Sequence, residues 1–191
     1  MIPLQLILKL ALATCFLLGC SACTAFSGGT TTIKPSPMSS YSADPDSEFG
    51  SRNNPVALGK SVVVNDWKVQ VLSVNTDATK MVMKADPFTS APSVDESFLM
   101  IQVKATYVGD ESGEPSLDLR FKIVGSKGNT FANSCGYSAN SFENNGETFP
   151  GASVTGNLCF TVDRDQIKGA TVSIQEGYSS EARKFVLIVP K

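Results

Sequence analysis

Residues 56–191 predict an all-β fold, an antiparallel sandwich of about seven or eight strands. Short segments in which apolar and polar side chains alternate recur along this part of the chain, as expected for strands with one buried face. Turn-forming Gly, Pro, Asn and Asp residues separate these segments. Only residues 163–168 have the pattern of a short helical turn, so the sequence does not predict the alternating βαβ order of a parallel sheet.

Two segments in the middle of this region show the alternation most clearly. One face of residues 98–108 is entirely apolar and consists of Leu99, Ile101, Val103, Ala105 and Tyr107. Residues 117–123 repeat the pattern, with Leu117, Leu119, Phe121 and Ile123 on one face. Further strands are expected at residues 61–64, 67–74, 154–162, 171–175 and 184–189. Two sheets of such strands, packed face to face, hide both apolar faces.

Residues 1–19 have the layout of a signal peptide for export. One positive charge, Lys9, precedes the apolar run 10–18, and the small residue Gly19 ends it. A membrane-spanning helix needs about 20 apolar residues, and here Lys9 interrupts the run. Cleavage is therefore expected, and a retained membrane helix is the alternative.

The residues Leu17-Leu18-Gly19-Cys20 resemble the lipobox of bacterial lipoproteins. The resemblance implies that the sulfur of Cys20 receives a diacylglyceryl group and that cleavage makes Cys20 the first residue. Cys23 has no aliphatic residue three positions before it, so Cys20 is the expected anchor. Two or three acyl chains hold a protein stably on a membrane, here the outer face of the bacterial cell membrane. Ordinary secretion with a free cysteine is the alternative.

Residues 20–55 predict a disordered tether. Ser, Thr, Gly and Pro dominate the stretch from residue 24, and apolar residues occur only singly, so little surface can be buried to offset the entropy of ordering. A flexible chain of this length reaches roughly 30 Å. The expected organisation is a signal peptide at 1–19, a lipid-anchored tether at 20–55 and a sandwich domain at 56–191.

The cysteines of the domain predict a disulfide. Cys135 and Cys159 are its only two cysteines, and an even pair in an exported domain is typical of a structural bridge. If Leu158 and Phe160 point into the core, Cys159 points outward, and Cys135 then lies in a segment that crosses this outer face. A redox-active pair is disfavoured because the CxxC spacing is absent.

The composition argues against catalysis and against nucleic acid as a partner. The chain contains no His, which is the commonest general base and metal ligand, and it carries a formal charge of -2 without a run of Lys or Arg. We therefore expect no catalytic residue, no cofactor and no metal. The acidic residues 110–114 fit a charged hairpin tip better than a calcium loop. Trp67 is expected in the core, with a sugar-stacking platform as the alternative.

The order of these segments, and above all Phe149-Pro150-Gly151 followed by a strand of the form Gly156-x-Leu158-x-Phe160, is similar to a family of lipoprotein domains of Gram-positive bacteria. Those domains are similar in fold to a secreted actinobacterial immunoprotective antigen. The resemblance covers about residues 54–191 and implies an immunoglobulin-like sandwich in a cell-surface setting. It implies no enzymatic activity and transfers no site residue.

Two functions remain open from the sequence. The first is a non-catalytic surface module that binds an unknown protein or envelope component. The second is an extracytoplasmic small-ligand-binding protein or an accessory subunit of a hydrolase that uses residues 76–97. This connection is long for a sandwich and contains Met81, Met83 and Phe88, although residues 79–84 are also compatible with an edge strand.

Overall fold

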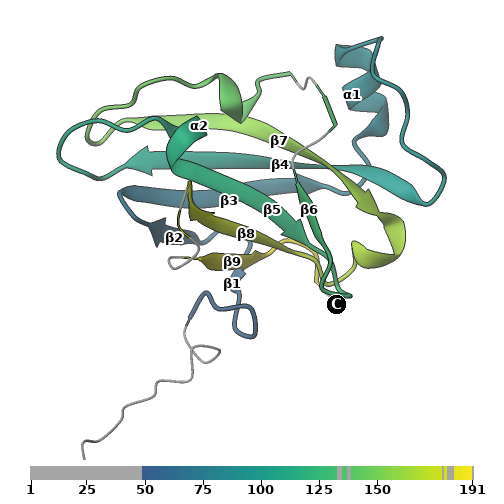
Figure 1. Cartoon of the computed structure of the whole chain (residues 1–191), viewed down its shortest axis with the longest axis horizontal. Helices are drawn as coiled ribbons and strands as arrows, with labels where there is room; N and C mark the ends of the chain where they lie inside the picture. The colour runs from purple at the N-terminus through teal and green to yellow at the C-terminus, as the bar shows by residue number, and fades with distance from the viewer. Residues whose placement is uncertain (1–48, 133–134, 137–138, 178, 180–182, 191) are drawn as a thin grey trace, which may run out of the picture. The chain divides into compact units, whose positions relative to one another are not determined.

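The computed structural model describes residues 49–132, 135–136, 139–177, 179 and 183–190, which belong to one compact unit that spans residues 41–191. This unit consists of two β-sheets packed face to face (Figure 1). The five-stranded sheet has the order β1 (Val56–Ala57), β9 (Lys184–Leu187), β8 (Thr171–Glu176), β5 (Leu119–Val124) and β6 (Thr130–Ala132). The four-stranded sheet has the order β2 (Ser61–Val64), β3 (Trp67–Asn75), β4 (Glu96–Tyr107) and β7 (Ser153–Asp163).

The sandwich predicted from the alternating pattern is confirmed. The described strands pair antiparallel except for β1 and β9, which run parallel. The predicted turn at 163–168 is also confirmed as a short 3-10 helix, η2 (Arg164–Gln166). The described residues form nine strands, more than the seven or eight that were predicted. The difference arises because the sequence pattern did not reveal β1 and β6. These two strands have only two and three residues, too few for an alternation to be visible.

The main core lies between the two sheets. Leu99, Ile101 and Val103 of β4 are fully buried there, as their alternation predicts. Trp67 is 1% exposed and lies edge-on to the ring of Tyr107 with 5.0 Å between ring centroids. Its indole Nε1–H donates a hydrogen bond of 3.0 Å to Asp118 Oδ2, which satisfies the one polar atom of the ring. Trp67 is thus a core residue, and the sugar-platform alternative is wrong.

Two predicted strand segments are wrong in part. Residues 79–84 do not form an edge strand but helix α1 (Thr79–Ala85), and Leu117 does not begin a strand. It lies in a helical turn, α2 (Pro115–Asp118), and is 52% exposed. Pro115 favours this turn, because its fixed φ suits the first helical position and its missing N–H needs no partner there.

The folded domain begins before residue 56. The Phe185 N–H of β9 donates a hydrogen bond of 2.7 Å to the carbonyl oxygen of Gly50, and the Gly50 N–H donates to the carbonyl of Asn54. Gly50 is itself buried. The last residues of the predicted tether, from residue 50 onward, therefore belong to the domain. The predicted signal peptide, Cys20, Cys23 and most of the predicted tether lie outside the described residues.

A short 3-10 helix, η1 (Phe142–Asn144), closes the sandwich beside β7. Phe142 is 1% exposed in the main core and lies edge-on to Phe121, with ring centroids 5.5 Å apart. The segment before η1 runs along the edge of β7, where the Asn157 N–H donates to the carbonyl oxygen of Asn140 at 2.7 Å. This cover protects part of an edge strand from pairing with another chain. Gly156 makes the close approach possible, since a Cβ there would lie 2.5 Å from Phe142 Cα.

Candidate functional site

A second, smaller core lies on the outer face of the four-stranded sheet. It consists of Ala78, Val82, Phe98, Met100, Cys135 and Cys159. Met100 of β4 and Cys159 of β7 are register partners, and both point away from the main core, in which their neighbours Leu99 and Phe160 are buried. The structure joins Cys135 and Cys159 as a disulfide with 5.5 Å between the Cα atoms. Cys159 thus lies on the outer face, as the alternation predicts.

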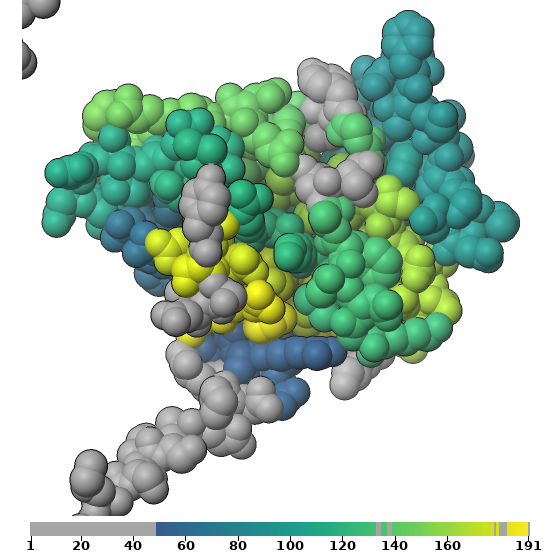
Figure 2. Space-filling view, in the orientation of Figure 1, coloured from purple at the N-terminus to yellow at the C-terminus, as the bar shows by residue number. Residues whose placement is uncertain are grey.

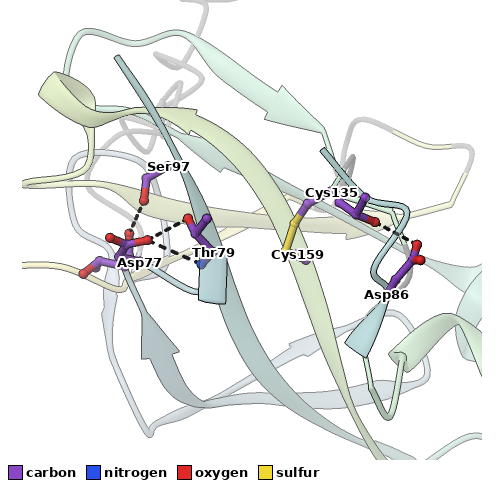
Figure 3. The surroundings of a disulfide bond; sticks show 8 residues. Asp77, Thr79, Asp86, Ser97, Cys135 and Cys159 are labelled. Carbon is purple, nitrogen blue, oxygen red and sulfur yellow. Dashed lines mark hydrogen bonds between the residues drawn. A yellow bond between two sulfur atoms is a disulfide. The ribbon is translucent and has the colours of Figure 1, made fainter. Parts of the chain in front are cut away.

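Helix α1 covers this outer core. Val82, in the middle of the helix, is fully buried, and Ala78 just before it is 1% exposed. These two residues are four positions apart, so they lie on the same side of a helical turn. Figure 3, in which the front of the helix is cut away, shows the disulfide together with Asp77 and Thr79 at the start of the helix and Asp86 just after its end. The long connection between β3 and β4 therefore packs against the outer face of the four-stranded sheet. We call residues 76–97, which include this connection and the first two residues of β4, the α1 segment.

Both ends of the α1 segment are fixed to the sandwich. The Ala78 N–H donates to the carbonyl oxygen of Phe98 at 2.7 Å, and the Ser97 hydroxyl donates to the carbonyl of Thr76 at 2.9 Å. Arg164 of η2 holds the other side, because its N–H donates to the Asp95 carbonyl at 2.8 Å and its Nε–H donates to the Val94 carbonyl at 3.2 Å. These bonds fix the two ends of the segment on the sandwich.

Asp86 shapes the turn that follows α1. Its Oδ2 accepts a hydrogen bond of 2.8 Å from the Thr89 hydroxyl, and its Oδ1 accepts one of 2.9 Å from the Phe88 N–H. These two hydrogen bonds hold the pKa of Asp86 below its usual value. Similar bonds from Thr79 lower the pKa of Asp77 at the other end of the helix. Both carboxylates are thus used in holding the segment's own shape.

The α1 segment exposes apolar side chains despite this fixed backbone. Phe88 is 96% exposed, Val94 86%, Met81 52% and Met83 40%. Four of the eleven large hydrophobic side chains that are exposed in the described residues therefore belong to this one segment. In Figure 2 the α1 segment projects from the body of the domain at the upper right. Exposed apolar groups concentrated on a projecting element are typical of a contact surface.

Two lysines flank these apolar groups. Lys80 and Lys84 are both exposed and are four residues apart on α1, so they lie on the same side of the helix. The carboxylates of Asp77 and Asp86 are engaged in the hydrogen bonds described above. These carboxylates remain negatively charged, and the segment also contains Asp95 and Glu96, so its apolar groups are bordered by charges of both signs.

Besides an open hollow of about 390 Å³ at the α1 segment, lined by Asp77, Thr79, Lys80 and Arg164, the described domain contains a cavity away from this segment. It has a volume of about 220 Å³ and lies between α2, β5 and η1. Phe121, Phe142 and Leu158 form apolar parts of its wall, and Arg120 and Glu143 form polar parts. Pockets for drug-sized ligands usually have about 300–1,000 Å³, so this cavity is small for such a ligand.

The acidic residues 110–114 lie at the opposite end of β4 from the α1 segment. Ser112 Oγ donates to Glu147 Oε1 at 2.7 Å, and Gly113 pairs with Thr148 through backbone hydrogen bonds. Burial raises the pKa of the nearby Tyr107 phenol, and Asp66 and Asp118 raise it further. Within the described residues, no three His, Cys, Asp or Glu side chains are placed to hold a metal ion together.

None of the helices in the described residues is long and apolar enough to cross a membrane. No protein-family model matches the sequence, and no curated protein matches it. The chain is nevertheless similar to several solved structures at low sequence identity. The yjhA protein from Bacillus subtilis is 15% identical with a TM-score of 0.47, and the comparison covers 70% of this chain and 98% of that chain.

Two further solved structures have a comparable likeness. The secreted protein MPT63 from Mycobacterium tuberculosis is 13% identical with a TM-score of 0.47, over 71% of this chain and 98% of that chain. The candidate lipoprotein ycdA from Bacillus subtilis is 18% identical with a TM-score of 0.45, over 68% of this chain and 38% of that chain. This chain therefore matches less than half the length of ycdA. Identities at this level do not indicate a shared function.

Proposed function

We propose that this chain is an exported lipoprotein, anchored through Cys20 on the outer face of the bacterial cell membrane, and that its sandwich is a non-catalytic interaction module. The observation that carries the proposal is the α1 segment, in which Phe88 is 96% exposed at a turn that Asp86 holds in place. A fixed loop on a rigid scaffold is the usual way in which sandwich domains present a binding surface.

The chemistry of the surface favours a protein as the partner. Aromatic residues and Met are enriched at the buried centres of protein interfaces, where a few aromatic side chains carry much of the binding energy. Phe88 therefore fits an apolar pocket of the partner, and Met81 and Met83 of the same segment are exposed as well. Lys80 and Lys84, together with the nearby carboxylates of Asp77 and Asp86, fit a partner whose charges are complementary at the border of that pocket, because opposite charges on the two surfaces speed association and select the partner.

The place of the α1 segment in the domain also supports this role. In Figure 1 the described chain enters beside β1, on the side of the domain opposite to α1. A domain tethered at its β1 side can thus direct the α1 segment away from the point of attachment. This arrangement suits display to a partner on the cell surface.

Replacement of Cys20 with Ala is expected to abolish acyl labelling of the chain and to release it from the membrane fraction, because two or three acyl chains on that sulfur would be the anchor. Metabolic labelling with a fatty-acid analogue and cell fractionation measure both effects, and Cys23→Ala is the matched control that should retain label and location. Labelling and membrane retention of the Cys20→Ala variant at the level of the natural chain would contradict the proposed anchor.

A photoreactive phenylalanine analogue placed at position 88 of the full chain is expected to cross-link to a protein in living cells. The matched control places it at Phe149, which is also exposed, at 60%, but lies at the other end of the sandwich. A specific adduct from position 88 that position 149 does not give supports the module. The same adducts from both positions, or none from position 88, would overturn it.

A small-ligand-binding protein or a hydrolase accessory subunit that uses residues 76–97 is the second function that the sequence left open. The hollow of about 390 Å³ at this segment is open and lined by the polar and charged residues Asp77, Thr79, Lys80 and Arg164, so it lacks the enclosed, mostly apolar lining of a typical small-ligand site. The cavity of about 220 Å³ lies elsewhere, between α2, β5 and η1. Incubation of the mature protein with glycoside, peptide and ester substrates tests whether the domain itself is catalytic. Turnover that one carboxylate substitution abolishes without unfolding the domain would replace the non-catalytic proposal.

A further inference from the structure

The α1 segment depends on the disulfide more closely than the rest of the domain does. The main core contains neither cysteine, whereas Cys135 and Cys159 are both members of the outer core on which Val82 of α1 lies. Each cysteine is 2% exposed. The disulfide therefore belongs to the outer-core surface on which α1 packs, which we call the floor under α1, and not to the contact between the two sheets.

A second contact joins the cysteine segment to the turn that carries Phe88. Gly136, next to Cys135, lies so close to the turn that a Cβ on it would be 3.2 Å from the hydroxyl oxygen of Thr89. The same hydroxyl donates to Asp86, which in turn accepts the Phe88 N–H. Figure 3 shows Asp86 and Cys135 on neighbouring segments. The position of residues 135–136 thus bears on both α1 and the exposed phenylalanine.

From these contacts we propose that the Cys135–Cys159 disulfide, which lacks the CxxC spacing of a catalytic redox pair, is instead a redox control of the α1 segment, so that only the oxidised protein presents the interaction surface. This inference rests on the proposed function of that segment. In the oxidised form, the bond holds residue 135 against β7 and completes the floor under Val82. After reduction, this floor is no longer covalently fixed, and α1 with its turn is free to leave the sheet.

The reductant that the step requires is a dithiol. One of its thiolates attacks one sulfur of the Cys135–Cys159 bond and forms a mixed disulfide, and the displaced cysteine sulfur takes up a proton. The second thiol of the reductant then breaks the mixed disulfide and releases the other cysteine. In total, two electrons and two protons pass to the cysteines, which become thiols, while the dithiol becomes a disulfide. Since each cysteine is 2% exposed, a transient opening of the outer core must precede the attack.

Hydrogen exchange of the mature protein before and after reduction with a small dithiol tests this control. We expect the backbone amides of Ala78, Val82 and Asp86, which are hydrogen-bonded in or beside α1, to exchange at least tenfold faster in the reduced protein. Exchange in the paired middle of β3 and β4 should remain unchanged, and so should the fluorescence of Trp67, which reports on the main core.

A Cys135→Ser, Cys159→Ser double variant provides the matched control. It should resemble the reduced protein and should not respond to the dithiol. If this variant does not fold, the comparison of hydrogen exchange in α1 before and after reduction of the folded natural protein still tests the inference. Unchanged exchange in α1 after complete reduction, or a simultaneous loss of protection in β3 and β4, would overturn the inference.

The photoreactive residue at position 88 separates this inference from the proposed function. Cross-linking that disappears on reduction supports both proposals. Faster exchange in α1 without any cross-link in the oxidised protein supports the control and contradicts the interaction module. Cross-linking that is equal in both redox states contradicts the control alone.

Discussion

Replacement of Ile101 with Ala is expected to lower the free energy of unfolding of the domain by about 3–4 kcal/mol. Ile101 is fully buried in the main core, and removal of a large aliphatic side chain there loses its transfer free energy and leaves a cavity. For a domain of this size, the loss corresponds to roughly 10 °C in Tm. Urea unfolding followed by Trp67 fluorescence measures the change, because that ring lies in the same core.

The neighbouring residue Met100 provides the matched control. It is 6% exposed and lies on the opposite face of β4, in the outer core under α1. We expect Met100→Ala to accelerate exchange of the α1 amides and to cost about 2 kcal/mol, at the low end for such a truncation, as for a site whose surroundings can collapse. If Met100→Ala destabilised the main core as much as Ile101→Ala, the two cores would not be separate units.

Replacement of Gly156 with Ala is expected to destabilise the domain by about 3 kcal/mol, at the upper end of what overpacking usually costs. The new Cβ would lie 2.5 Å from Phe142 Cα and 2.6 Å from Phe142 N, and these are backbone atoms that cannot turn aside. Helix η1 would have to move away from β7, and this would pull the Phe142 ring from its contact with Phe121. Urea unfolding measures the cost.

Gly146→Ala is the control for Gly156, because a Cβ at position 146 would have no neighbour within 4 Å. This substitution should change the free energy of unfolding by no more than about 0.5 kcal/mol, as is usual at open surface sites. A Gly156→Ala variant as stable as Gly146→Ala would show that η1 does not hold the position described above.

The sequence predicted the main core well because strand alternation depends on a physical constraint. Successive side chains point to opposite faces, so Leu99, Ile101 and Val103 could only face the same way, and a slip of one residue would have exposed all three. The same reasoning placed Cys159 on the outer face. The family resemblance included Gly156 in its motif, but the reason for a glycine there became clear only from its close approach to the backbone of Phe142.

Helix α1 could not be recognised from the sequence. Its seven residues bury only Val82, so the helical period of apolar positions has no room to appear. Met81 and Met83 stand two residues apart, which imitates the alternation of a strand. What makes this segment a helix is tertiary packing on Met100 and the disulfide, since isolated helices of this length are not stable in water.

Presentation of the α1 segment to a protein partner is tested most directly by the affinity of the mature protein for the partner that cross-links at position 88. The measurement compares the natural chain with Phe88→Ser and with Phe149→Ser, which removes an exposed phenylalanine at the other end of the sandwich. We predict at least tenfold weaker binding for Phe88→Ser, a loss of about 1.4 kcal/mol or more, and unchanged binding for Phe149→Ser. Equal affinity of Phe88→Ser and the natural chain would contradict the proposed surface.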